Sequence, residues 1–286
     1  MKFIVALCFV VVAVQATEVE WNTLIPRHII PPEFGDYLPR DKIESRIVGG
    51  LPAEPGQFPY QIGLQLQTTA GNYFCGGSIL NEEWILTAAH CVDLPGTVVI
   101  ILGAHNVSTV ENTQKRIVAE EIIIHKNWDS SLIRNDIAVV RLSEKIEFND
   151  RIQPVRLPKK SKVSSTFASA TGTVSGWGLD SDSSNSISPV LRWVQNNIMT
   201  NFLCNIYYIG VVQSSNICLS GSGGRSTCSG DSGGPLVITD TDGEVTQVGI
   251  VSFGIALGCE IGWPGVFTRV TSYLDWIENN TGIHLQ

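Results

Sequence analysis

The segment CSGDSGGPL, Cys228–Leu236, places an aspartate and a serine within a run of glycines. Because glycine has no Cβ atom, such a turn can direct consecutive backbone N–H groups at one point beside the Ser232 hydroxyl. A glycine-rich turn by itself is more often only a turn, and a serine is a weak nucleophile without an adjacent base. If a base is supplied, the segment predicts Ser232 as a nucleophile and the N–H groups of Gly230 and Ser232 as an oxyanion hole.

Two further segments contain the groups that such a serine requires. LTAAHC, Leu86–Cys91, contributes His90, and NDIAVVRL, Asn135–Leu142, contributes Asp136. A histidine takes the proton from the serine hydroxyl, and an aspartate holds the imidazole in the required tautomer and stabilises its charged form. We therefore expect His90, Asp136 and Ser232 to form a catalytic set.

The composition is that of a globular protein without a nucleic-acid partner. The chain has 286 residues with a hydrophobic fraction of 43%, which is ample for a packed core. Its 19 lysines and arginines are outnumbered by 27 aspartates and glutamates, for a net charge of -8. Such a chain has no basic field with which to collect phosphates, so nucleic acid is not expected as a partner.

The N-terminus has the pattern of a secretory signal. An unbroken apolar run, Phe3–Val14, follows Lys2, and the small residues Val14 and Ala16 precede a cleavage point. The run is shorter than the roughly 20 residues that span a bilayer, so no membrane anchor is expected. We therefore expect residues 1–16 to be a signal peptide and the protein to be secreted into the extracellular space.

The rest of the chain divides into a leader and a strand-rich body. Residues 17–46 contain four prolines among charged residues and no helical or alternating apolar period, which predicts a poorly ordered leader. From Ile47 onward, short β-branched runs are separated by turn residues, which predicts an all-β fold, an antiparallel sandwich or barrel. The exceptions are a short helix at Ser272–Ile277, capped by Ser272, and a serine-rich surface loop, Leu179–Ser188. The predicted strand segments are YQIGLQL, GTVVIILG, RIVAEEIII, DIAVVRL, TGTVSGWG, PLVITD, VGIVSFG and GVFTRV.

The cysteines indicate an oxidising compartment. Cys8 lies within the signal, which leaves six cysteines in the exported chain. An even number in a secreted protein favours disulfides, although spacing alone does not choose among the pairings. A zinc site is disfavoured because no C-x-x-C or paired Cys/His spacing is present.

The segments TAAHC, GDSGGP and IVGG are all intact, and the reactive residues follow the order histidine, aspartate, serine. Together they resemble the trypsin/chymotrypsin family of serine endopeptidases. The resemblance extends from Ile47 to about Gly282. It implies two antiparallel β-barrels packed at right angles, with the site in the cleft between them and a short C-terminal helix outside. His90 and Asp136 are then expected from the first barrel and Ser232 from the second.

The same resemblance implies further contacts around the site. Ser252 is expected to donate a hydrogen bond to Asp136, while Phe253 and Gly254 pair with the substrate backbone as an added strand. The implied disulfides are Cys75–Cys91, Cys204–Cys218 and Cys228–Cys259.

The segment ESRIVGG, Glu44–Gly50, is the activation site that the resemblance implies. Family members are switched on by a cut before this Ile-Val-Gly-Gly, here the bond between Arg46 and Ile47. The freed ammonium of Ile47 is expected to pair with Asp231 and to order the oxyanion turn. The alternative for Asp231 is a turn-stabilising side chain only. The expected divisions are a signal peptide at 1–16, an activation propeptide at 17–46 and a serine peptidase domain at 47–286.

The substrate pocket is expected to be open and uncharged. Its floor in this family lies six residues before the nucleophile, where this chain has Ser226 in place of an aspartate. The wall positions are Gly254 and Gly265, and Thr227 narrows the pocket slightly. Such a pocket resembles the chymotrypsin type, so cleavage after large apolar or aromatic residues is expected. Leucine and aromatic residues both remain candidates.

The expected function is that of a chymotrypsin-like digestive enzyme, and there are two alternatives. The segment GCEIGWPGVFTRVTSYLDWI also resembles the arthropod digestive and collagenolytic branch of the family, the brachyurins. In that case Glu260, near the pocket, broadens the specificity. The second alternative is a non-catalytic binding protein on the protease fold, which is disfavoured because no member of the catalytic set is missing. The expected partners of a monomeric enzyme are protein or peptide substrates, an activating trypsin-like protease and protease inhibitors.

Neither a metal nor a cofactor is expected. The positions at which calcium-binding members of the family carry glutamates hold Ala104 and Gln114, which leaves Glu111 as the one carboxylate within reach, whereas Ca²⁺ prefers several. Asn106 and Asn279 begin matches to the glycosylation acceptor pattern.

Overall fold

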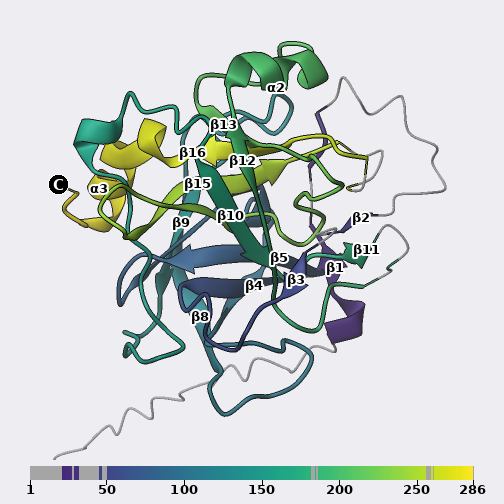
Figure 1. The fold of residues 1–286 in the computed structure, drawn as a ribbon. Coiled ribbons are helices and arrows are strands. Elements are labelled where there is room, and N and C mark those ends of the chain that lie inside the picture. The colour runs from purple at the N-terminus through teal and green to yellow at the C-terminus, as the bar shows by residue number, and fades with distance from the viewer. Residues whose placement is uncertain are drawn as a thin grey trace, which may run out of the picture.

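Two closed antiparallel sheets form the body of the protein (Figure 1). The computed structural model describes residues 21–27, 29–31, 45–46, 50–181, 184, 186–255, 259 and 261–285. The predicted signal peptide and two site residues, Ile47 and Glu260, lie outside the described residues.

The first barrel has six strands, in the order β5-β4-β7-β8-β9-β6, and closes through the pairing of β5 with β6. Its strands are β4 (Gln61–Thr68), β5 (Gly71–Ile79), β6 (Trp84–Thr87), β7 (Thr97–Leu102), β8 (Lys115–Ile124) and β9 (Ala138–Leu142). A short strand, β1 (Ile25–Pro26), adds to β5 in parallel.

The second barrel also has six strands, in the order β10-β14-β15-β16-β13-β12, and closes through β10 and β12. Its strands are β10 (Thr171–Gly176), β12 (Arg192–Met199), β13 (Asn216–Leu219), β14 (Pro235–Thr239), β15 (Val245–Phe253) and β16 (Gly265–Arg269). β3 (Leu51–Pro52) pairs with β12, and β2 (Ser45–Arg46) pairs with β11 (Asp180–Ser181) in a separate ribbon.

Apolar side chains from alternate strand positions fill the two barrels. Leu64, Ile85 and Val139 are fully buried in the core of the first barrel, and Leu236 and Phe267 in that of the second. All of the strand segments predicted from the sequence form strands, and the all-β expectation is confirmed as two barrels.

Two helices lie outside the barrels. The C-terminal helix α3 (Leu274–Thr281) follows a 3₁₀ turn over Val270–Tyr273, so Ser272 lies within that turn and not at the cap, contrary to expectation. A second helix, α2 (Asn201–Tyr208), was not predicted and begins at Thr200, whose side chain accepts a hydrogen bond from the Leu203 N–H.

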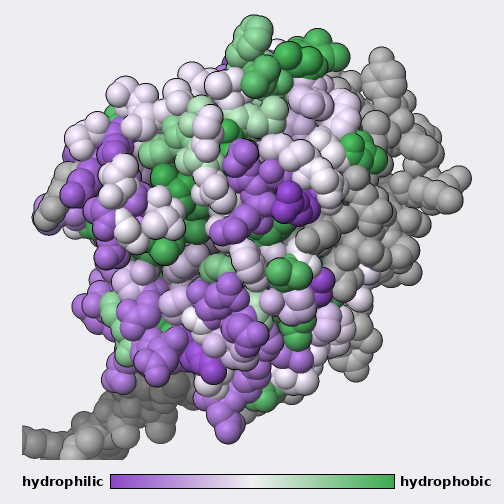
Figure 2. Space-filling model, in the orientation of Figure 1, coloured by the Kyte–Doolittle hydropathy of each residue, from purple (hydrophilic) through white to green (hydrophobic). Residues whose placement is uncertain are grey.

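Helix α2 presents an apolar face outward. Phe202, Ile206 and Ile209 are exposed, and Figure 2 shows this apolar group at the top of the molecule. Among the described residues, no helix is both long and apolar enough to cross a bilayer.

The expectation of a poorly ordered leader was wrong for one part of it. Residues 21–27 and 29–31 lie against the body, with Leu24 and Pro31 buried. The serine-rich loop is also anchored at its ends, where Leu179 and Ile187 are buried. Neither segment has an apolar period of its own. The contacts that hold it come from distant parts of the chain, so they leave no local signal in the sequence.

Buried polar side chains join the two barrels. The Ser78 hydroxyl of β5 donates to Gln247 Oε1 of β15 at 2.6 Å, and the Ser175 hydroxyl of β10 donates to Gln61 Oε1 of β4 at 2.7 Å. All four side chains are buried. A buried acceptor without a donor costs free energy, so these bonds favour the one relative position of the barrels in which both bonds form.

We predict that Ser78→Ala lowers the free energy of unfolding by about 1–3 kcal/mol, because it leaves the buried Gln247 oxygen without its donor. Urea denaturation of the full chain measures this change. The matched control is Ser143→Ala at an exposed position, which should stay within about 0.5 kcal/mol of the wild type. Equal effects of the two substitutions would contradict the assigned role of the barrel contact.

Candidate active site

His90 and Asp136 meet at the edge of the first barrel. His90 lies in a 3₁₀ turn, Ala89–Cys91, after β6, and its Nδ1 is 2.8 Å from Asp136 Oδ2. The backbone N–H of His90 donates to Asp136 Oδ1 at 3.0 Å, and the Ser252 hydroxyl donates to Oδ2 at 2.6 Å. The aspartate therefore holds both the ring and the backbone of His90, and the expected bond from Ser252 is present.

Asp136 is ionised in this setting. It is 1% exposed, and burial alone raises the pKa of a carboxyl group. The neighbouring His90, together with the hydrogen bonds from His90 and Ser252, outweighs burial and holds the pKa of Asp136 below its usual range. An ionised Asp136 accepts from the Nδ1–H of His90, which leaves Nε2 free to accept a proton.

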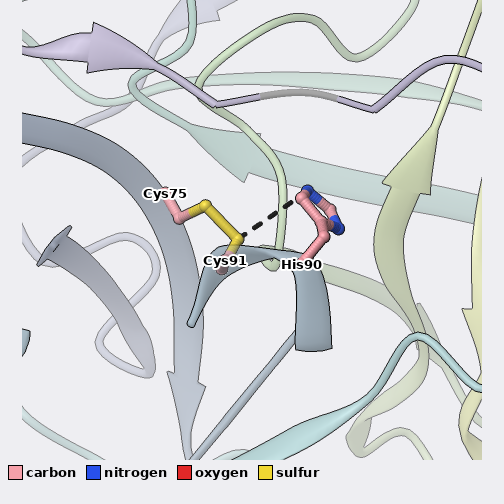
Figure 3. A group of neighbouring side chains, drawn as sticks. All are labelled: Cys75, His90 and Cys91. Atoms are coloured by element: carbon pink, nitrogen blue, oxygen red, sulfur yellow. Dashed lines mark hydrogen bonds between the residues drawn. A yellow bond between two sulfur atoms is a disulfide. The ribbon is translucent and has the colours of Figure 1, made fainter. Parts of the chain in front are cut away.

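A disulfide fixes the position of the histidine turn. Cys75 of β5 is bonded to Cys91, directly after His90, and Figure 3 shows the ring beside this bridge. Cys91 Sγ lies 3.9 Å from His90 Nε2. The three side chains are near enough to hold a metal ion, but the two sulfurs are bonded to each other and offer no thiolate.

Ser232 lies in the turn between β13 and β14, against the first barrel. Its carbonyl accepts from the Gly76 N–H of β5 at 2.7 Å, next to the cysteine that bridges to the histidine turn. Gly233 has a φ of 79°, and a Cβ there would lie 2.2 Å from Thr87 Oγ1. The turn thus requires glycine, both for its backbone conformation and for its close approach to the first barrel.

Among the described residues, no hydrogen bond joins the Ser232 hydroxyl to His90. Hydrogen bonds between catalytic residues are often long before substrate binds, so its absence is compatible with Ser232 and His90 acting together in catalysis. The N–H of Gly230, expected in the oxyanion hole, donates to the carbonyl of Arg27 in the leader at 3.4 Å.

Asp231 is fully buried in a cradle of glycines. Its Oδ1 accepts from the Gly178 N–H at 2.8 Å and its Oδ2 from the Cys228 N–H at 2.9 Å. A Cβ on Gly178 would lie 2.5 Å from its Cγ, and one on Gly176 would lie 2.2 Å from Oδ1. No cation pairs with it among the described residues, and burial raises its pKa to about 7.

The pocket residues gather beside this turn. Ser226 is buried, and Gly265 lies so close to Thr227 that a Cβ would approach Thr227 Oγ1 to 2.9 Å. A Cβ on Gly254 would meet no atom of the described residues within 4 Å. One wall is therefore open, while the side chain of Thr227 occupies the space beside the other.

The known proteins that the chain matches agree on one family. The family model described as Trypsin matches residues 47–277. The chain belongs to the trypsin family. It is 46% identical to brachyurin of Leptuca pugilator over 237 residues, covering 83% of this chain and 99% of the relative. It is 39% identical to chymotrypsin of Phaedon cochleariae, covering 88% and 90%.

A collagenase appears in both the sequence and the structure comparisons. The chain is 40% identical to collagenase of Hypoderma lineatum, covering 84% of this chain and 89% of the relative. A solved structure of HL collagenase superposes with a TM-score of 0.75 at 39% identity, covering 83% of this chain and all of that one. The protein is therefore a chymotrypsin-like serine endopeptidase.

Further predicted residues of this trypsin-family protease have these places. The expected disulfides Cys75–Cys91, Cys204–Cys218 and Cys228–Cys259 are present. The backbone of Arg46 lies in β2, opposite Asp180. Glu111 Oε2 accepts from the backbone N–H groups of His105 and Asn106, so this carboxylate already has donors. Asn279 is exposed on α3.

Sequence reasoning missed the residues that hold the reactive ones in place. Gly176 and Gly178 form the cradle of Asp231, and the Thr268 hydroxyl donates to the Asp136 carbonyl at 2.7 Å. The segment TGTVSGWG was interpreted as a strand only. Its paired glycines were the available signal, since a glycine within a strand often marks a close approach of another group.

We predict that burial of Asp231 makes the uncleaved protein less stable as the pH rises. Its folded pKa, about 7, lies above the usual 3.8. Between these two values the folded state keeps a proton that the unfolded chain releases, so the free energy of unfolding falls as the pH rises. The destabilisation begins near pH 4, grows to about 4 kcal/mol at most, and levels off above pH 7. Asp231→Asn removes this pH dependence and loses one hydrogen bond at every pH.

The measurement is urea denaturation of both uncleaved proteins between pH 4 and pH 8. The difference in unfolding free energy, mutant minus wild type, should rise over this range, while the lost hydrogen bond adds only a constant. A difference that does not change with pH would show that the Asp231 carboxylate is better compensated than its contacts indicate.

Proposed function

We propose that Ser232 is the nucleophile, His90 the general base and Asp136 the group that orients and stabilises the histidine. The single observation that carries this is the buried series Ser252–Asp136–His90, with bonds of 2.6 and 2.8 Å, on the first-barrel side of the Ser232 turn. The roles follow those of the trypsin family, in which this set is well understood.

In the proposed reaction, Ser232 Oγ attacks the carbonyl carbon of the peptide bond as its proton passes to His90 Nε2. His90 then gives this proton to the leaving amine, and water repeats the sequence to release the acyl group. Asp136 stays ionised throughout, because its lowered pKa favours the carboxylate beside a charged imidazole.

The oxyanion is the proposed ligand of two backbone N–H groups, those of Gly230 and Ser232. Gly230 has a φ of 95°, a conformation that glycine adopts without strain. In the uncleaved chain its N–H donates to the carbonyl oxygen of Arg27, an acceptor of the same chemical kind as a substrate carbonyl, which supports the proposed role. Losing one such donor typically reduces turnover by about 10²–10³.

We propose that cleavage after Arg46 activates the enzyme. The new ammonium of Ile47 pairs with Asp231, which in the uncleaved chain is buried without a cation among the described residues. The pairing lowers the pKa of Asp231 and raises that of the ammonium, so the active form is favoured below the raised pKa and lost as the pH rises through it. The pairing also orders the turn that carries Ser232, because Asp231 directly precedes this residue.

We propose a secreted, monomeric digestive enzyme that cuts proteins and peptides after large apolar or aromatic residues and is controlled by an activating trypsin-like protease and protein inhibitors. The uncharged Ser226 and the open wall at Gly254 support this specificity, as does the relative named chymotrypsin. The predicted signal at residues 1–16 supports secretion.

A second candidate function is the cleavage of collagen. It is favoured by the similarity to proteins named brachyurin and collagenase. An extended substrate of this kind needs cleft contacts beyond the pocket, and Glu260 is the candidate residue for a broader preference. Digestion of native collagen, compared with a gelatin control, separates this function from general peptidase activity.

We predict that Ser232→Ala and His90→Ala each abolish most activity of the cleaved enzyme, and that the double mutant is hardly worse than either. Nucleophile and base act as one unit, so their losses do not multiply. Asp136→Asn should reduce turnover by about 10⁴ by favouring the wrong histidine tautomer. Peptide hydrolysis and organophosphate labelling of Ser232 provide the measurements. Losses that multiply, or labelling elsewhere, would argue against the assigned roles.

We predict that the proenzyme does not activate itself. The bond to be cut follows Arg46, whereas the pocket floor is Ser226, and an unpaired guanidinium in an uncharged pocket costs several kcal/mol. This corresponds to about a hundredfold or more against arginine. Pure proenzyme is incubated alone and with a trace of trypsin-like protease, and the new N-terminus is sequenced.

Ile-Val-Gly-Gly should arise only with the added protease. If pure proenzyme produces this terminus with accelerating kinetics, and Ser232→Ala stops it, the pocket accepts arginine. The proposed specificity is then wrong, although the proposed catalytic residues stand.

A further inference from the structure

The described part of the leader contacts both barrels near the proposed catalytic residues. It begins with a 3₁₀ turn, Trp21–Thr23, and the Leu24 side chain is 7% exposed. Leu24 packs in an apolar cluster with Phe74 of β5 and Trp177. This cluster draws on both barrels, so the leader starts at the seam between them.

From this cluster the leader continues as β1 along β5. Ile25 pairs with Tyr73 and Pro26 with Phe74, in parallel, and the Arg27 N–H donates to the Phe74 carbonyl at 3.0 Å. Phe74 directly precedes the cysteine that bridges to the histidine turn. Figure 1 shows the purple β1 beside β5. The leader thus occupies the edge of β5 as an added strand.

Arg27 attaches the leader on both sides of the cleft. Its carbonyl accepts from the Gly230 N–H, the proposed oxyanion donor, and a Cβ on Gly230 would lie 3.4 Å from Pro26 Cβ. Its guanidinium pairs with Asp93 at 2.7 Å and lies over the ring of Tyr73. The Arg27 side chain therefore points to the histidine side and not to Ser226.

Beyond Arg27 the leader reaches the substrate-pairing strand. Ile29 packs against an apolar cluster that includes Phe253 and Ile133, and Pro31 is buried. Phe253 is the residue expected to pair with substrate backbone. The leader thus contacts β5 and the Gly230 turn, and then an apolar cluster to which the end of β15 contributes Phe253.

We propose that the leader segment Trp21–Pro31 is an inhibitor that fills the substrate cleft and occupies the oxyanion donor of the proenzyme. This inference rests on the proposed function, because it takes Gly230 and Phe253 as substrate-binding groups. It adds a second control, separate from the pairing of Ile47 with Asp231: the cut frees the new terminus, and release of the leader opens the cleft.

Covalent connection makes weak binding sufficient. A tethered segment experiences an effective concentration on the order of millimolar, so a leader with millimolar affinity still fills the cleft of the intact chain. Residues 17–46 contain no cysteine, so after the cut only non-covalent contacts hold the leader. Dilution in the extracellular space then removes it.

The test uses the enzyme cleaved after Arg46 and separated from its leader. Its hydrolysis of a small chromogenic substrate is measured with a synthetic peptide of residues 21–31. We expect competitive inhibition at about 1 mM peptide, with KM raised twofold or more, kcat unchanged and the peptide intact by mass spectrometry.

Two variant peptides serve as matched controls. Leu24→Asp places a charge in the buried cluster and should weaken inhibition by about tenfold or more. Ile25→Asp makes the same change one residue later at a half-exposed side chain, and should change inhibition by about twofold at most.

Three results overturn the inference: no inhibition at about 5 mM peptide, equal inhibition by the Leu24→Asp and wild-type peptides, or rapid cleavage of the peptide as a substrate. The activity without peptide tests the proposed function separately. An enzyme that is active but indifferent to the peptide refutes the inhibitory leader alone.

Discussion

A single buried carboxylate, that of Asp231, constrains the centre of the molecule. It has no exposure, and its two oxygens hold the N–H groups of Gly178 and Cys228. Gly176 and Gly178 lie so close to it that a side chain at either position would overlap the carboxylate. Because Asp231 precedes Ser232, its position constrains the turn that carries the proposed nucleophile. In the proposed activation, the ammonium of Ile47 compensates this charge only after the chain is cut, which links burial energy to the control of activity.

The two barrels contribute different parts of the chemistry, and their contact determines whether the parts meet. The first holds His90 and Asp136 on rigid strand ends, and the second holds Ser232 and Ser252. Buried polar bonds and the Gly76–Ser232 backbone bond join the halves. Pre-organisation of this kind is worth most at an active site, because small displacements of reacting groups cost much of the rate.

The sequence predicted the barrels, the contacts of Asp136 with His90 and Ser252, and the disulfide pairing, because family segments and β-branched runs report local and shared features. It did not predict β12, where Asn196 points inward and is satisfied by the distant Ser222 carbonyl. It missed α2, whose exposed Phe202 and Ile206 break the expected amphipathic pattern. The sequence also did not predict the docked leader. The contacts that order this segment come from residues far along the chain, and the segment has no apolar period of its own.

The ion pair between Arg27 and Asp93 has a consequence for the order in which bonds are cut. A protease that cleaves after arginine meets Arg27, Arg40 and Arg46 in the leader. Cleavage requires a segment to leave its partners and enter another active site, and Arg27 is held by its ion pair, the Tyr73 ring and the strand contact. The docked leader therefore protects the bond after Arg27.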